Sequence, residues 1–150
     1  TIIKKENSFV NAVYYPVSIK DLNKTDRRES GYCRVKVEGK DLSFYGKKIK
    51  TKNKNFWVYA ANPGKIKKPS RSHPIVQSYV DLFIGGCFQI KEKYKINEFP
   101  KQCVQTTTEW SKYWVNDRVH ARRPFLVPNF YKIDNLLSNF FNYYLDNKYQ

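Results

Sequence analysis

The pattern of apolar and polar residues in the first half of the chain predicts β-strands. Residues 32 to 38 alternate strictly, which is typical of a strand buried on one face. One face carries Cys33, Val35 and Val37, and the other carries Arg34, Lys36 and Glu38. Residues 9 to 19, FVNAVYYPVSI, have apolar side chains on both faces. They indicate a strand covered on both sides, with Pro16 at an edge or bulge.

The segments that follow extend this pattern into a meander. Residues 20 to 31 are polar and predict a loop, and Gly39-Lys40 fits a tight type II′ hairpin turn. Alternation resumes after that turn, and lysines recur at every second position from 48 to 54, which would place them on one strand face. After a turn near residues 52 to 55, the β-branched and aromatic residues 56 to 59 predict another strand.

Helical spacing replaces alternation in the second half. Ser72-His73-Pro74 predicts a helix start, and Gly85-Gly86 predicts the end of that helix. Residues 87 to 90 indicate a short strand and residues 98 to 106 a loop. Thr106 to Glu109 match a capping box, and the following helix would hold Trp110, Tyr113 and Trp114 as core residues.

The last helix shows the clearest pattern. It starts near Pro128-Asn129 and carries an unbroken apolar stripe at positions 133, 136, 137, 140, 141 and 144. The stripe fits two alternatives, packing on the sheet or forming a dimer surface. Together these patterns predict an α+β fold in which an antiparallel β-meander of four to five strands has two to three helices packed on one face. We expect one domain over residues 1–150, β-rich at about 8–61 and helical at about 72–147.

Composition narrows the function classes. The 150-residue chain has a formal net charge of +15, and 17% of its residues are aromatic. Such an excess of positive charge favours a polyanionic partner, and the aromatic content argues against a disordered basic tail. We expect no membrane span, because no apolar run approaches about 20 residues. Cys33, Cys87 and Cys103 form no paired motif, which favours reduced thiols and an intracellular location, in cytoplasm or nucleus.

The strongest functional signal lies between residues 46 and 72. Two lysine-rich runs flank the aromatic strand at 56 to 59, and no acidic residue interrupts them. Lysines neutralise phosphates, and exposed aromatic rings stack on bases. Trp57 and Tyr59 share one strand face, and we expect that face to be the basic one. The candidate nucleic-acid-binding residues here are Lys47, Lys48, Lys50, Lys52, Lys54, Trp57, Tyr59, Lys65, Lys67, Lys68 and Arg71.

A second basic cluster contains Arg118, Arg122 and Arg123, together with His120. Arginine suits bidentate contacts to phosphate or guanine, so these three arginines are further candidates, although a surface loop without a role fits equally well. His73 has no second histidine or carboxylate near it in sequence, and we interpret it as a solvent-facing residue. Neither a cofactor nor a metal site is expected.

Residues 33 to 64, CRVKVEGKDLSFYGKKIKTKNKNFWVYAANPG, with Lys65 and then His73-Pro74-Ile75, resemble the core of SpoVG-type small nucleic-acid-binding proteins. The resemblance covers less than a third of the chain. It implies DNA or RNA binding and a homodimer built through the sheet, and it implies nothing about the C-terminal part.

Non-catalytic binding of nucleic acid, with single-stranded DNA or RNA slightly favoured over duplex, is the function that these features predict. One alternative is an interaction or capsid-type protein, viral in character, that packages nucleic acid on a basic face. Another is a metal-dependent nuclease built from Asp81, Gln89 and Lys91 on a strand pair. A homodimer could form through the sheet or the 130–147 helix.

Overall fold

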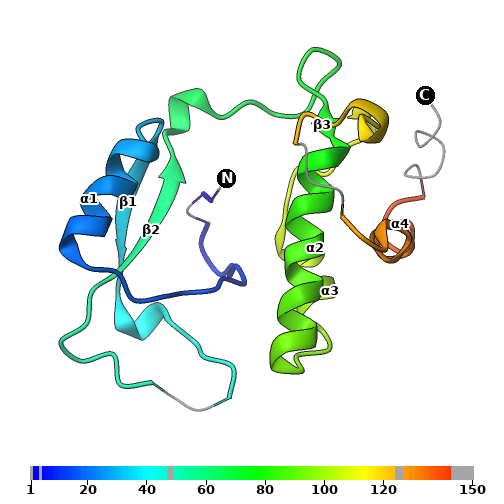
Figure 1. Ribbon diagram of the computed structural model, residues 1–150. Coiled ribbons are helices and arrows are strands. Elements are labelled where there is room, and N and C mark those ends of the chain that lie inside the picture. The colour runs from blue at the N-terminus through cyan, green and yellow to red at the C-terminus, as the bar shows by residue number, and fades with distance from the viewer. Residues whose placement is uncertain (1, 4, 47–48, 124–126, 143–150) are drawn as a thin grey trace. The chain divides into compact units, whose positions relative to one another are not determined.

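The computed structural model describes residues 2–3, 5–46, 49–123 and 127–142. Its contacts divide the chain into two compact units (Figure 1). Unit 1 comprises Thr1–Glu6 and Tyr14–Ile66, and unit 2 comprises Asn7–Val13 and Lys67–Gln150. We describe each unit by itself, and the expected single domain stays a prediction.

Unit 1 is built from one helix and one two-stranded ladder. Its elements are α1 (Ile19–Arg28), β1 (Tyr32–Val37), the 3-10 turn η1 (Gly39–Asp41), β2 (Phe56–Ala61) and the 3-10 turn η2 (Pro63–Lys65). Strands β1 and β2 pair antiparallel, with Val37 opposite Phe56 and Tyr32 opposite Ala61. The two strands predicted from alternation and from aromatic content are therefore both confirmed, but they pair with each other directly.

Helix α1 occupies the segment that the polar composition predicts to be a loop, so that prediction is wrong. Ser18 caps the helix by accepting a hydrogen bond from the backbone N–H of Asp21 at 3.1 Å. The acidic Asp21 lies in the first turn, and the basic Arg27 and Arg28 lie in the last, as the helix dipole favours. Because none of its residues is buried, core packing contributes little to this helix, and these end effects favour its formation.

The described residues between β1 and β2, 38–46 and 49–55, contain η1 but no strand, in place of the predicted hairpin and lysine strand. Gly39 belongs to η1, and a Cβ there would lie 2.7 Å from the Thr51 hydroxyl oxygen. Glycine is therefore needed at 39 because the two ends of the loop approach each other at this point. Lys47 and Lys48 lie outside the described residues.

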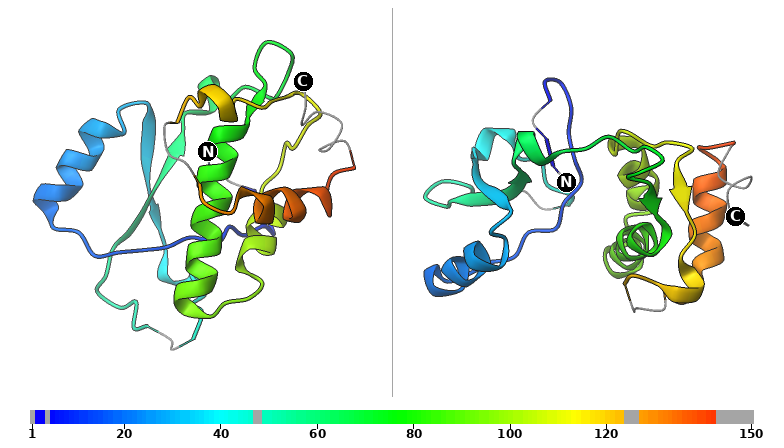
Figure 2. Two further views of the ribbon diagram at one scale, coloured as in Figure 1. Left: turned by 45° about the vertical axis from the view of Figure 1, so that its right-hand side comes forward. Right: turned by 90° about the horizontal axis from the view of Figure 1, so that it is seen from above.

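Unit 2 is mainly helical. Its elements are β3 (Ile75–Val76), α2 (Gln77–Tyr94), α3 (Phe99–Thr106), β4 (Trp114–Val115), the 3-10 turn η3 (Arg118–His120) and α4 (Phe130–Ser138). The short strands β3 and β4 pair in parallel, with Ile75 opposite Trp114. Helix α2 packs against both α3 and α4 (Figure 2).

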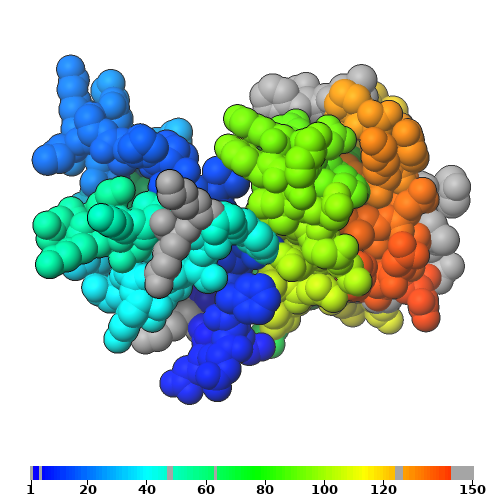
Figure 3. All heavy atoms as spheres, turned by 90° about the horizontal axis from the view of Figure 1, so that it is seen from below, coloured from blue at the N-terminus to red at the C-terminus, as the bar shows by residue number. Residues whose placement is uncertain are grey.

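The core of unit 2 lies between these helices. Its buried side chains are Val80, Ile84, Val104, Trp114, Ile133 and Leu137. The Trp110 and Trp114 rings stack 5.7 Å apart, which agrees with their predicted core role, whereas Tyr113 is exposed. Figure 3 shows α2, α3 and α4, coloured green to orange, packed as one body.

Helix α2 runs through the two glycines that the sequence indicates as a helix end. A Cβ at Gly85 would lie 3.0 Å from the Val127 side chain, so this glycine permits a close approach within unit 2. The helix ends at Tyr94, and its C-cap residue Lys95 adopts the left-handed conformation with φ 59°. The strand predicted at 87 to 90 is therefore wrong.

Three other predicted elements are also wrong. Residues 99 to 106 of the predicted loop form α3, with Pro100 in the first turn where proline is tolerated. The segment from 107 to 119 contains β4 and η3 but no α-helix, and residues 9 to 18 form no strand. Among the described residues the structure has two sheets of two strands each, so the predicted meander of four to five strands is wrong, although the α+β class holds.

The start of the last helix is confirmed as α4, but this helix ends at Ser138, and the described residues 139 to 142 of the predicted helix are not helical. Ile133 and Leu137 are 1% and 0% exposed, respectively, and belong to the core of unit 2. This burial favours the packing alternative over a dimer surface at these two positions. Residues 143 to 147 of the predicted helix lie outside the described residues.

Candidate nucleic-acid interface

One face of the β1–β2 ladder carries cations and aromatic rings together. The register places Arg34 opposite Tyr59 and Lys36 opposite Trp57, and opposed residues share a face. We call these four residues the strand face. The Arg34 guanidinium lies 4.7 Å from the centre of the Trp57 ring, which is 39% exposed. The predicted placement of Trp57 and Tyr59 on one basic face is therefore confirmed.

The opposite face of the ladder is less polar. Phe56 packs edge-on against Tyr14 at 6.0 Å and lies 6.4 Å from Phe44. Val35, on the same face, is 43% exposed, so the predicted burial of that face is only partly realised.

Asp26 of α1 connects the helix to the strand face. The Tyr59 hydroxyl donates to Asp26 Oδ1 at 2.6 Å, and Arg34 Nη1 donates to Asp26 Oδ2 at 2.9 Å. Desolvation and the hydrogen bond to Asp26 both raise the pKa of Tyr59. Tyr59 is therefore held by α1, and Trp57 is the more accessible of the two rings.

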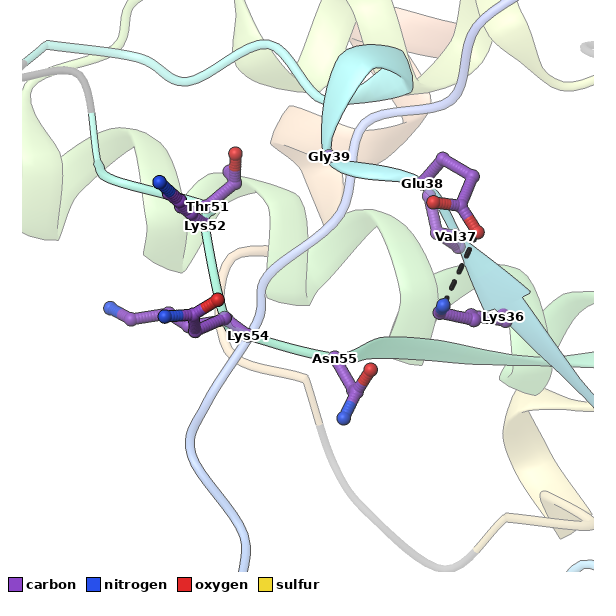
Figure 4. A pocket seen from close by; sticks show the side chains of 9 residues that line it. Lys36, Val37, Glu38, Gly39, Thr51, Lys52, Lys54 and Asn55 are labelled. Atoms are coloured by element: carbon purple, nitrogen blue, oxygen red, sulfur yellow. Dashed lines mark ion pairs between the residues drawn. The ribbon is translucent and has the colours of Figure 1, made fainter.

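A lysine-lined hollow of about 470 Å³ adjoins the strand face at Lys36 (Figure 4). The end of β1 and the loop segment before β2 form its walls. Lys36 lies 3.5 Å from Glu38, whereas Lys52 and Lys54 have no carboxylate partner among the described residues. Such a hollow offers uncompensated positive charge next to an exposed ring.

The other predicted lysines divide between the units. Lys50, Lys52 and Lys54 are exposed on the loop of unit 1, and Lys65 is exposed at the end of η2. Figure 3 shows this loop at the surface in cyan and blue-green. Lys67, Lys68 and Arg71 are exposed residues of unit 2, where Lys68 lies 3.6 Å from Glu109.

Arg118 is held inside unit 2 by two carboxylates. Its guanidinium donates to Asp81 at 2.7 Å through Nε and Nη2, and to Asp134 at 2.8 Å through Nη2. Burial alone would lower the pKa of Arg118, but these hydrogen bonds raise it, so the group stays charged. Gln77 donates to Asp81 and accepts from Trp114, which extends the network into the core. With only 18% of its side chain exposed, Arg118 is poorly placed to bind phosphate.

Arg122 and Arg123, by contrast, are exposed on a loop that is fixed to the start of α2. Asp117 accepts hydrogen bonds from the backbone N–H of Ser78 and Arg122, both at 2.8 Å, and from the Ser78 hydroxyl at 2.7 Å. Burial alone would raise the pKa of Asp117, but these three hydrogen bonds lower it overall. The loop therefore presents both arginines from an ordered backbone.

Two residues of the strand face, Arg34 and Lys36, were absent from the predicted candidates. Their alternation with apolar residues was visible in the sequence, but their position beside Trp57 depends on the pairing of β1 with β2. No sequence signal gives that register, because 18 residues separate the strands.

The residues suggested for a nuclease lie elsewhere than expected. Asp81, Gln89 and Lys91 are on helix α2 and not on a strand pair, and Arg118 and Gln77 bind Asp81. The described residues contain no group of three or more His, Cys, Asp or Glu side chains that could hold a metal ion. His73 is exposed, as predicted, and its Nδ1 lies 3.0 Å from the Ser72 hydroxyl.

No family model, curated protein or solved structure matches this chain. The resemblance to SpoVG-type proteins stays a prediction on the sequence alone. Within the described residues, none of the helices has the length and apolar character needed to cross a membrane.

Proposed function

We propose that this protein binds nucleic acid without catalysis, preferring single strands, and that the strand face is its primary contact. The single observation that supports this most directly is the exposed Trp57 ring with the Arg34 guanidinium 4.7 Å from its centre. Bases stack on such rings, and arginine adds a cation–π contribution. The adjoining hollow supplies Lys52 and Lys54 for the phosphates.

The preference for single strands follows from the shape of this contact. A flat ring on a two-stranded ladder can stack only on a base that has left the duplex stack. The exposed helix of unit 1, α1, carries Arg27 and Arg28 in its last turn, but the acidic Asp21 lies in its first turn and Asp26 binds the strand face, so it is poorly suited to read a major groove. Stacking tolerates any base, so we expect weak sequence preference.

Replacing Trp57 by Ala tests this proposal. We expect affinity for single-stranded DNA or RNA to fall by about 1 to 3 kcal/mol, the value of one stacked base. Melting temperature should change little, because Trp57 is 39% exposed. Tyr94→Ala, which removes a 54% exposed ring from the end of α2, is the matched control and should leave affinity unchanged. A large drop in melting temperature with unchanged affinity per folded molecule would contradict the proposal.

A further inference from the structure

Unit 2 repeats the pairing of an arginine with an exposed ring. The Arg123 guanidinium lies 4.5 Å from the centre of the Tyr79 ring, and Tyr79 is 47% exposed. Arg34 and Trp57 make the same kind of pair in unit 1, at 4.7 Å. Both pairs join residues that are distant in sequence, so each depends on the fold and not on chain adjacency.

The surface around Tyr79 continues along α2. Phe83 lies four residues after Tyr79, so the two rings share one helix face, and Phe83 is 44% exposed. Leu82, with the same exposure, lies next to them. Large apolar side chains exposed in a group on a helix mark a binding surface more often than chance exposure does.

The charge beside these rings is uncompensated. Neither Arg122 nor Arg123 forms an ion pair with a carboxylate of the described residues. Asp117 is close, but it receives hydrogen bonds from the backbone of Arg122 and from Ser78 and so serves to fix the loop. The guanidinium groups of these two arginines are therefore available to bind an external anion.

We propose that Tyr79, Phe83, Arg122 and Arg123, the α2 platform, form a second and separate contact for single-stranded nucleic acid. A base stacks on Phe83 or on the open side of Tyr79, and the two guanidinium groups bind the neighbouring phosphates. A single-stranded nucleic acid supplies both the flat bases that can stack on these rings and the phosphates that the arginines can bind. An acidic peptide would pair with the two arginines but would offer no bases to stack on the two rings. The inference rests on the proposed function, because it gives the same ligand class a second contact.

The test uses the full chain and an oligothymidylate of about 30 nucleotides, longer than one typical single-strand site. Phe83→Ser combined with Arg123→Gln removes one ring and one charge from the α2 platform. The matched control, Tyr94→Ser with Lys93→Gln, removes one exposed ring and one charge from the last turn of the same helix. We expect the platform variant to bind about 5- to 150-fold more weakly than wild type, the range for one stacked base, and the control to bind like wild type.

A second variant guards against a folding defect. Arg122→Gln with Arg123→Gln changes only exposed loop side chains and should also weaken binding. In wild type, ultraviolet cross-linking of a 5-bromouracil-containing strand should label a peptide with Tyr79 or Phe83, and this label should persist in the Trp57→Ala protein.

The outcomes separate the two proposals. Wild-type protein that binds no strand would overturn both. If wild type binds the strand, Trp57→Ala weakens that binding, and the platform variant binds as tightly as its control, the second contact alone would be overturned. Oligoglutamate, an acidic peptide, is a second probe. If the platform variant loses oligoglutamate binding that wild type shows, and still binds oligothymidylate like wild type, then the ligand of the α2 platform is an acidic protein and not nucleic acid.

Discussion

Arginine side chains occupy two different environments in this protein. Arg34 and Arg123 lie over the exposed rings of Trp57 and Tyr79, and Arg34 also pairs with Asp26 at 2.9 Å, at a site where its side chain is 32% exposed. Arg118 lies between two carboxylates whose side chains are 8% and 4% exposed. The sequence shows Arg118 in one basic cluster with Arg122 and Arg123. It could not reveal the different role, because the partners Asp81 and Asp134 are 37 and 16 residues away.

The buried network leads to a prediction about Arg118. Arg118→Met should destabilise the fold by roughly 3 to 5 kcal/mol, because it leaves two buried carboxylates without a counter-charge. Adding Asp134→Asn should recover part of that loss, since one of the unpaired charges is then removed. Urea unfolding of the single and double variants measures both effects.

Affinity provides the second readout for this residue. Strand binding per folded molecule should be the same in Arg118→Met and wild type, because the guanidinium is already bound inside unit 2. Arg122→Met is the control for stability and should unfold like wild type, as exposed substitutions usually do. If folded Arg118→Met protein bound nucleic acid more weakly than wild type, Arg118 would have to be counted among the phosphate-binding residues.

Helix α2 illustrates how an element depends on distant residues. Its N-cap residue, Val76, has no side-chain cap, and Asp117 accepts the Ser78 N–H from 39 positions away. Gly85, in the middle of the helix, accommodates Val127. Both features explain why the predicted bounds of this helix are wrong: the cap and the reason for the glycine are tertiary contacts. Helix α1 is different, because its Ser18 and Asp21 form a local capping pattern that the sequence already contained.

Strands β1 and β2 and the start of α4 were predictable for a physical reason. Alternation at 32 to 38 and the apolar stripe around Ile133 and Leu137 are local periodicities that burial or pairing reinforces. The turn between strands was not predictable in this way. Gly39-Lys40 fits a hairpin, but 18 residues separate β1 from β2, and the two ends of this connection meet at Gly39 and Thr51.

The cap of α2 has a pH dependence that can be measured. The folded state lowers the pKa of Asp117 below its ordinary value of 3.8, so folding favours the carboxylate. Its contribution is fully present above that ordinary value and is lost as pH falls through the lower folded pKa. Asp117→Asn should therefore cost about 0.5 to 2 kcal/mol near neutral pH, the range for loss of a helix cap. The difference from wild type should shrink below pH 3.8.

Urea midpoints across this pH range test the prediction. Glu98→Gln is a suitable control, because that carboxylate is 64% exposed and, among the described residues, pairs with the exposed Lys101 at 3.7 Å. Exposed pairs contribute little to stability. A constant difference between Asp117→Asn and wild type at all pH values would mean that the carboxylate charge is not what stabilises the start of α2.

At the scale of the whole molecule, charge is the dominant property. A net charge of +15 on 150 residues is spread over both units, and most lysines lie exposed without a partner carboxylate among the described residues. Such a chain attracts any polyanion, and only the arrangement of cations decides which phosphates it contacts. The Lys50–Lys54 segment is the densest run of exposed lysines next to the strand face, so it should form the phosphate track.

This assignment predicts a change in salt dependence. Each phosphate contact contributes about 0.7 to the log–log salt slope for a single strand, so replacing Lys50, Lys52 and Lys54 by Gln should flatten the slope by roughly 2. The matched control replaces three exposed lysines of unit 2, Lys93, Lys95 and Lys101, and lowers the net charge equally. Binding measured at several salt concentrations should show the flattening only in the first variant, with similar weakening for every sequence. Equal slopes in the two variants would show that total charge, and not this segment, governs binding.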